Sequence, residues 1–380
     1  MVRISLLFAI AVGIVDVPLA ASDPAGRDSN RLTSTRPFSR STVSRGPSTV
    51  DILVDRRWRT GLHLLDSQTE SLVMGRDGVL HTVSLDRRES HMRVSEQPFK
   101  AASAAEMRNQ LRAEFGSGFE VVATQNFLVV QPKSRGRRWP NMFETSHRSF
   151  VDYMTRRGVS VRQGRFPMVA VVFPDSHAMY AEFQRLDLDV SRVSGLYANR
   201  CNRVMTHDGG QLESIIATVR HEAAHQSAFN TGVHSRVNDT PSWITEGIGQ
   251  LFEPSAIASG HAGSHVGERV NHDSLNHLES KGFMQDPDLM RELVQRMILT
   301  DQLFDDRATV HTAYSVAWAM MFYLAERDHD AMARMLNFTA TRPPFSNYSR
   351  QQREIDFRRI VGVDPVVFAN RLIKFLETLR

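Results

Sequence analysis

Two histidines and a glutamate stand near the middle of the chain with the spacing of a metal site, in His221-Glu222-Ala223-Ala224-His225. On an α-helix, residues four apart differ by about 40° and rise about 6 Å. Both imidazoles could then reach one zinc ion, whose bonds to nitrogen are about 2.0–2.1 Å long. Glu222 would border the same face, where a general base for a metal-activated water belongs. The simpler alternative is a pair of solvent-facing histidines on an amphipathic helix.

The residues on either side of this pattern predict the helix that it needs. An apolar stripe at helical spacing leads into His221, and Gly232 stands where a glycine commonly ends a helix. The stripe consists of Leu212, Ile215, Ile216 and Val219. A third histidine of the metzincin type is missing, because Ala228 and Thr231 occupy the positions of its glycine and histidine.

A glutamate on a following helix is the other common third ligand, and Glu246 is the candidate. We expect Thr240 to cap that helix and Pro241 to be its first residue. Two helices joined by a short loop can face each other, which would complete a set of two histidines and one glutamate with an open position. Taken alone, Glu246 would be interpreted first as an exposed helix carboxylate.

At these residues the chain resembles the gluzincin zinc metallopeptidases, and more narrowly the peptidase-MA-like family of exported bacterial proteins (domain of unknown function 1570). The zinc-helix pattern is followed by Trp243-Ile244-Thr245-Glu246-Gly247, a pairing more specific than the short motif alone. The resemblance extends to Phe119–Val130, to Asn202-Arg203-Val204 and to the segment that begins at Tyr314.

This resemblance implies that His221, His225 and Glu246 bind one Zn²⁺ ion and that Glu222 is the base. It implies an antiparallel edge strand beside the site, over Leu196–Met205, that holds an extended peptide or protein substrate. Tyr314 is the candidate donor to the oxyanion, and its alternative role is to pack on Trp318, four positions further along. Where thermolysin-like enzymes have a supporting aspartate, this chain has Gln250, so the supporting carboxylate comes from elsewhere or is missing.

The function that we expect is therefore zinc-dependent hydrolysis of peptide bonds. Glu222 would take a proton from the attacking water and pass it to the leaving amine. One alternative is an envelope protein that binds zinc and serves as a binding or scaffold module without catalysis. Another is an adhesion protein whose basic segment contacts an acidic polymer.

The order of elements predicts an α+β fold with a zincin-like catalytic domain: a mixed sheet with an edge strand, the zinc helix and a helical C-terminal subdomain. Strands are expected at 119–122, 127–130 and 166–173, and helices at 102–115, 143–154, 176–186 and 365–379. Short alternating runs around the turn Arg76-Asp77-Gly78 predict a small β unit over 51–99. The catalytic domain would span 100–380, divided into 100–232 and 233–380.

The N-terminal residues predict export. Arg3 precedes the apolar run Ile4–Val15, and Ala20-Ala21-Ser22 offers a cleavage site, so residues 1–21 are expected to be a signal peptide. Residues 22–50, rich in Ser, Thr, Arg, Pro and Gly, would be a flexible basic linker. We expect neither a nucleic-acid partner nor a membrane span in the mature chain.

Cysteine and the other histidines add little to this hypothesis. Cys201 is the single cysteine, which excludes an intrachain disulfide and a metal site built on cysteines. The tract with His261, His265, His272 and His277 could form a second metal site, although its glycines favour a loop.

Overall fold

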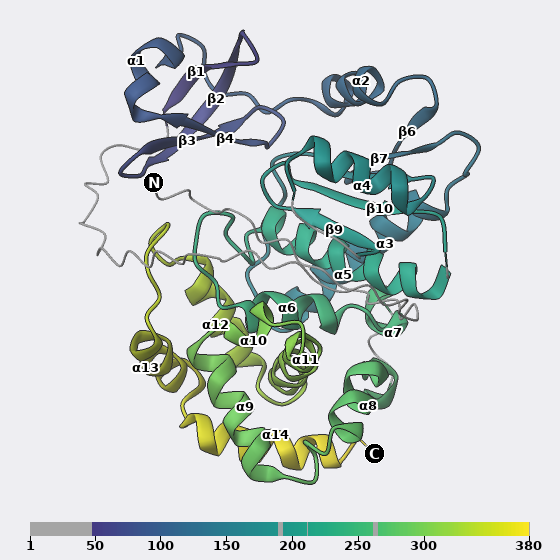
Figure 1. Ribbon diagram of the computed structural model, residues 1–380, viewed down its shortest axis with the longest axis vertical. Helices are drawn as coiled ribbons and strands as arrows, with labels where there is room; N and C mark the ends of the chain where they lie inside the picture. Colours follow the sequence, from purple (N-terminus) through teal and green to yellow (C-terminus); the bar gives the residue numbers. More distant parts are fainter. Residues whose placement is uncertain (1–47, 189–192, 211, 261–264, 380) are drawn as a thin grey trace, which may run out of the picture.

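The computed structural model describes residues 48–188, 193–210, 212–260 and 265–379 of the 380-residue chain, and shows an α+β fold with two sheets and many helices (Figure 1). The expected signal peptide and nearly all of the expected linker lie outside the described residues. In the described part of the chain, we find no helix that is both long and apolar enough to cross a membrane.

The first sheet, called here the N-terminal sheet, is antiparallel and has the strand order β4-β3-β2-β1-β5. Its strands are β1 (Thr49–Val54), β2 (Arg57–Asp66), β3 (Glu70–Gly75), β4 (Leu80–Ser84) and β5 (Met92–Val94). A 3₁₀ turn (Leu85–Arg87) and the short α1 (Arg88–His91) join β4 to β5. The turn between β3 and β4 contains Gly78, whose φ of +82° explains why the Asp-Gly pair occurs there. Val50, Ile52, Val73 and Val83 form the core of this sheet.

The second sheet, called here the mixed sheet, has the order β6-β7-β8-β10-β9. Its strands are β6 (Phe119–Ala123), β7 (Phe127–Pro132), β8 (Met168–Phe173), β9 (Gly195–Ala198) and β10 (Arg203–His207). β8 runs parallel to both β7 and β10, whereas the pairs β6–β7 and β9–β10 are antiparallel. The two predicted strands at 119–122 and 127–130 are confirmed as an antiparallel pair.

The prediction of a single edge strand over Leu196–Met205 is wrong. The chain reverses within this range and forms the hairpin β9–β10, in which only β9 lies at the edge of the sheet. Asn202, in the reversal, has a φ of +57°, a left-handed conformation that asparagine tolerates better than most residues. Pairing of β10 with β8 places the hairpin beside the middle of the sheet.

Helices cover both faces of the mixed sheet (Figure 1). On one face lie α2 (Ala104–Phe115) and α4 (Ser176–Arg185), which bury Met107, Leu111, Met179 and Phe183. On the other lie α3 (Arg138–Arg156) and α5 (Leu212–Thr231), and Ile215 and Val219 of α5 pack against strand residues of that face. This packing fixes the helix that carries the histidine pair directly on the sheet.

The described residues from 242 onward are mostly helical and pack around one large core. Their elements are α6 (Ser242–Leu251), α7 (Ser255–Ala258), a 3₁₀ turn (Val266–Arg269), α8 (His272–Ser280), α9 (Pro287–Leu299), α10 (Gln302–Asp305), α11 (Val310–Arg327), α12 (His329–Ala340), α13 (Arg350–Val361) and α14 (Pro365–Glu377). α6 crosses α11 so closely that a Cβ at Gly247 would lie 2.7 Å from the carbonyl oxygen of Ala317. Glycine is therefore required there by the contact between the two helices.

Candidate metal centre

Helix α5 carries His221, Glu222 and His225, and all three side chains are fully buried. The alternative of two solvent-facing histidines is thereby excluded. As predicted, the helix ends before Gly232, whose φ is +79°. Burial follows from the position of α5, which has the mixed sheet on one side and α6 on another.

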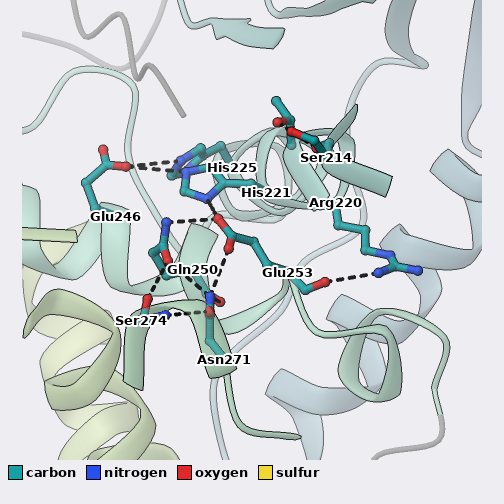
Figure 2. Close-up of polar contacts among 10 residues, drawn as sticks. Ser214, Arg220, His221, His225, Glu246, Gln250, Glu253, Asn271 and Ser274 are labelled. Atoms are coloured by element: carbon teal, nitrogen blue, oxygen red, sulfur yellow. Dashed lines mark hydrogen bonds and ion pairs between the residues drawn. The ribbon is translucent and has the colours of Figure 1, made fainter. Parts of the chain in front are cut away.

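Glu246 faces the two histidines from α6, as Figure 2 shows. Its Oε2 lies 3.4 Å from Nε2 of His221 and 3.7 Å from Nε2 of His225. None of these three buried atoms has a hydrogen-bond partner among the described residues. Together they form a group that could hold a metal ion, with its ligand atoms all within 4.8 Å of one another.

The start of α6 differs from the prediction. The helix begins at Ser242, and Pro241 takes the N-cap position in place of Thr240. The hydroxyl of Thr240 is buried without a hydrogen-bond partner among the described residues. Asp301 instead accepts a hydrogen bond of 2.8 Å from the backbone N–H of Ser242, so a side chain 59 residues away does the work of the cap.

A carboxylate that the sequence did not predict contacts His221 on the side of the ring opposite Glu246. Nδ1 of His221 lies 2.9 Å from Oε1 of Glu253, so the tautomer with a proton on Nδ1 donates to the carboxylate and leaves Nε2 free to face Glu246 (Figure 2). Gln250 donates to the same Glu253 oxygen at 2.8 Å, and Asn271 donates to the other oxygen, also at 2.8 Å. Gln250 thus positions the supporting carboxylate and does not replace it.

The spacing of Glu246, Gln250 and Glu253 contains a signal that could have found this residue. Positions separated by four and then three residues share one face of a helix, and Glu253 follows the end of α6 by two residues. A candidate ligand (Glu246), an amide (Gln250) and a second carboxylate (Glu253) on one helix face therefore indicate hydrogen bonds that could support a metal-binding histidine.

Gly249 lets α6 approach the histidine closely. A Cβ at this position would lie 2.4 Å from both Cε1 and Nε2 of His221, a distance that no relaxed structure tolerates. The absence of a side chain at Gly249 therefore provides the space that the imidazole of His221 occupies when its Nε2 faces Glu246.

Burial and the two carboxylates shift the pKa values of the site in opposite directions. Burial alone would lower the pKa of His221, but contacts with Glu246 and Glu253 outweigh it and raise this pKa to about 10. Burial raises the pKa of Glu222 to about 8, although the positive charge of His221 opposes the shift. Burial would raise the pKa of Glu246, yet the two histidines hold it below its usual value. Burial lowers the pKa of His225.

Strand β9 contacts the site through one backbone group. The N–H of Tyr197 donates a hydrogen bond of 2.7 Å to Oε2 of Glu222, while Oε1 of the same carboxylate has no partner among the described residues. The carboxylate is therefore tied by one oxygen, and the other remains available.

Tyr314, the candidate oxyanion donor, lies on α11 beside His221. The two ring centroids are 6.3 Å apart in an edge-to-face arrangement. The ring of Phe304 also packs against the ring of Tyr314, with 5.6 Å between their centroids. The structure thus brings Tyr314 to the candidate metal-ligand group, next to His221.

His234 is a second residue that the sequence analysis missed. It lies in the connection between α5 and α6, is 1% exposed, and has no hydrogen-bond partner among the described residues for either ring nitrogen. Burial, assisted by the nearby charge of His225, lowers its pKa to about 3, so its imidazole is neutral at physiological pH. No spacing rule relates it to His225, because it follows the end of the helix.

The second metal site that the sequence left possible in the histidine-rich tract is not found among the described residues, where His221, His225 and Glu246 make up the one candidate group. His261 lies outside them. His277 instead lies 3.0 Å from the hydroxyl of Thr312, and its ring lies 4.2 Å from the ring of His311.

Two curated proteins of Bombyx mori are similar to a short part of the chain. They are named Antichymotrypsin-2 and Antitrypsin, and each is 28% identical over 103 residues, which is 24% of this chain. The matched segment spans about a quarter of each relative, 27% and 26% of their lengths. Residues 215–346, which include the histidine pair, Glu246, Glu253 and Tyr314, match the model of the family described as "Protein of unknown function (DUF1570)".

Proposed function

We propose that this protein is a zinc-dependent peptidase of the gluzincin type, exported from the cell. The observation that carries the proposal is the convergence of three buried ligand atoms that have no hydrogen-bond partner among the described residues, Nε2 of His221, Nε2 of His225 and Oε2 of Glu246, beside the buried carboxylate of Glu222. Apart from the contacts of 3.4 and 3.7 Å that Glu246 makes with the two histidines, nothing among the described residues offsets the burial of these atoms, and a bound ion would do so.

The donor set and its spacing fit zinc. Two nitrogens and one carboxylate oxygen are ligands of catalytic zinc sites. Two atoms about 2.1 Å from one ion in a tetrahedral arrangement lie about 3.4 Å apart. The distances of 3.4 and 3.7 Å from Glu246 to the two histidines agree with that separation. The bond from Glu253 to Nδ1 of His221 supplies the outer partner that a zinc-binding histidine usually has.

A zinc ion in this set would supply a Lewis acid that lowers the pKa of water toward neutrality and polarises a substrate carbonyl. Glu222 would act as the general base through Oε1, because Tyr197 already occupies Oε2. Burial raises the pKa of Glu222 in the metal-free protein, and the positive charge of a bound zinc ion would lower it again, so that the carboxylate could take a proton from water and return it to the leaving amine. Tyr314 and the neutral His234 are the candidate donors to the oxyanion.

The arrangement of α5, α6 and β9 is consistent with a zincin-like fold. The zinc helix packs on a mixed sheet, and the edge strand β9 runs antiparallel to its neighbour beside that helix. In this proposal an extended peptide lies along β9, where backbone groups at the free edge of a sheet can bind it.

The test is cleavage of a broad peptide library by the full-length protein, with and without a chelator. We expect about one zinc ion per chain and chelator-sensitive cleavage. Glu222→Gln should keep the zinc and lower the rate about a hundred- to ten-thousandfold. Glu213→Gln, an exposed residue on the same helix, is the matched control and should cleave normally. Cleavage at the normal rate by Glu222→Gln would remove the role of Glu222.

A zinc-bearing envelope protein without catalysis is the second candidate, and one observation favours it. The two histidines and Glu222 are 0% exposed and Glu246 is 4% exposed, as is usual for a structural metal site. This function predicts that zinc raises stability, that no library peptide is cleaved, and that Glu222→Gln changes neither result.

A further inference from the structure

We infer that the N-terminal sheet positions the general base Glu222, acting through Arg236 and strand β9. The inference rests on the proposed function for the role of Glu222, but each link is a contact between described residues. Arg236 is in this sense a positioning residue, because it acts on the carboxylate through the backbone of β9.

The first link joins β9 to Glu222. The N–H of Tyr197 in β9 donates to Oε2 of Glu222 at 2.7 Å. β9 is an edge strand that pairs with β10 on one side, so a shift of β9 would carry this donor with it. A carboxylate held by a single hydrogen bond follows its donor, and a misplacement of about 1 Å can cost a hundredfold in rate.

The second link joins Arg236 to the turn between β9 and β10. Nε of Arg236 donates to Oδ1 of Asn199 at 2.9 Å, and Nη2 donates to the carbonyl oxygens of Asn199 and of Arg200, the latter at 3.0 Å. The planar guanidinium therefore holds the turn that directly follows β9 in three places. Arg236 itself lies in the connection from α5 to α6, close to the metal ligands in the chain.

The third link joins Arg236 and the same turn to the N-terminal sheet. Nη1 of Arg236 donates to the carbonyl oxygen of Gly78 at 2.6 Å, and the N–H of Leu80 in β4 donates to the carbonyl oxygen of Arg200 at 2.9 Å. The turn from β3 to β4 sits tightly: a Cβ at Gly78 would lie 3.2 Å from the ring of Phe166 and 3.4 Å from Nδ2 of Asn202.

Arg236, the turn between β9 and β10 and the turn between β3 and β4 form one junction, and loss of any of its hydrogen bonds should weaken it. The Arg236 guanidinium donates to neutral oxygens in the four hydrogen bonds described above, and burial lowers the pKa of this group. Removing the N-terminal contact takes away one of those acceptors. Removing the guanidinium takes its donors from the side-chain and carbonyl oxygens of Asn199, while the carbonyl oxygen of Arg200 keeps the N–H of Leu80. Either change should loosen β9.

The experiment compares zinc-loaded, full-length variants altered on either side of the junction. Arg236→Gln removes the guanidinium, and Arg56→Gln, at the exposed tip between β1 and β2, is its control. Gly78→Ala forces the turn from β3 to β4 away from Phe166, and Gly158→Ala is its control, because Gly158 has a similar φ of +74° and nothing within 4 Å. Zinc content shows whether each variant keeps its folded site.

The first measurement is hydrogen exchange at the amide of Tyr197. We expect about tenfold faster exchange or more in Arg236→Gln and in Gly78→Ala, and wild-type exchange in both controls. With a peptide from the library, kcat should fall about tenfold or more while KM stays within about twofold, and Arg236→Lys should recover part of the loss.

Unchanged exchange at Tyr197 in both altered proteins would overturn the inference, whatever their activity. If Arg236→Gln loses its zinc, hydrogen exchange at Tyr197 in Gly78→Ala alone decides whether the inference holds. If the wild-type protein cleaves nothing, the proposed function fails separately, and the exchange measurement still decides whether the N-terminal sheet holds the edge strand against Glu222.

Discussion

Oε1 of Glu253 lies 2.9 Å from Nδ1 of His221, on the side of the ring away from Glu246. One imidazole is thus held between two carboxylates, one on each ring nitrogen. The first belongs to the candidate metal set and the second fixes the tautomer that presents Nε2 to it. Most of the behaviour expected of the site follows from this arrangement.

Removal of the outer carboxylate should weaken metal binding without abolishing it. Glu253→Gln keeps an acceptor for Nδ1 but loses its charge, so we expect the zinc affinity to fall about ten- to hundredfold. Competition with a chromophoric chelator measures it. Glu213→Gln, exposed on α5, should bind as the wild type does. An unchanged affinity for Glu253→Gln would mean that this carboxylate does not support the ligand.

Zinc affinity should rise with pH across the neutral range. The pKa of His221 in the metal-free protein, about 10, means that zinc must displace a proton below that pH, at about tenfold in affinity per pH unit. The same raised pKa stabilises the metal-free fold below pH about 6.5, and that contribution disappears as the pH rises through about 10. Chelator competition at pH 6.5, 7.5 and 8.5 tests this, and affinity independent of pH would contradict it.

A methyl group at Gly249 should destroy the site. Its Cβ would lie 2.4 Å from the imidazole of His221, so Gly249→Ala must displace the ligand or the helix, at a cost of about 1–3 kcal/mol in unfolding free energy. We expect loss of bound zinc and a lower thermal midpoint. Gly118→Ala, at a glycine with nothing within 4 Å, is the control and should leave both unchanged. Full zinc content in Gly249→Ala would disprove the crowding argument.

The long-range cap on α6 should be measurable as stability. Asp301 accepts from the N–H of Ser242 and from Arg353, at 2.8 and 2.6 Å. Asp301→Ala should lower the unfolding free energy by about 1–2 kcal/mol in urea denaturation of the metal-free protein. Asp305→Ala, at an exposed position nearby, should cost far less. Equal midpoints for the two variants would show that the cap contributes nothing.

Loss of the Tyr314 hydroxyl should lower the rate of cleavage and leave zinc binding unchanged. If Tyr314 donates to the oxyanion, Tyr314→Phe keeps its zinc while kcat falls about hundredfold and KM changes little. Tyr323→Phe, on the same helix with its ring packed against Phe368 and Phe375, is the matched control. Steady-state kinetics on a cleaved library peptide measure both. A fall in zinc content in place of kcat would assign Tyr314 to packing around His221.

Local periodicity was enough to predict most elements of the fold. The paired strands β6 and β7, the buried strand β8 and the helix α14 occur close to where apolar spacing indicates them. The sequence predicts one strand over Leu196–Met205 because Tyr197 and Val204 occur among polar residues, on either side of the reversal. The reversal depends on Asn202 at positive φ, and the polar run from Asn199 to Asn202 was its available signal.

The ligands of the candidate site were predictable, whereas their supports were not. His221, His225 and Glu246 follow from spacing along two helices, a local property. Glu253 lies beyond the end of α6, His234 lies in a loop, and the cap on α6 comes from Asp301, 59 residues further along. Such contacts depend on how the helices meet in three dimensions, which periodicity within a single element does not contain.

Every residue of α6, from Ser242 to Leu251, is buried. A helix with no exposed face cannot fray or bend open on its own, because any movement exposes the core packed around it. An ion held between α5 and α6 would therefore escape only when that core opens. The half-life of bound metal in excess chelator would then measure the kinetic stability of the whole helical region, at temperatures far below its melting point.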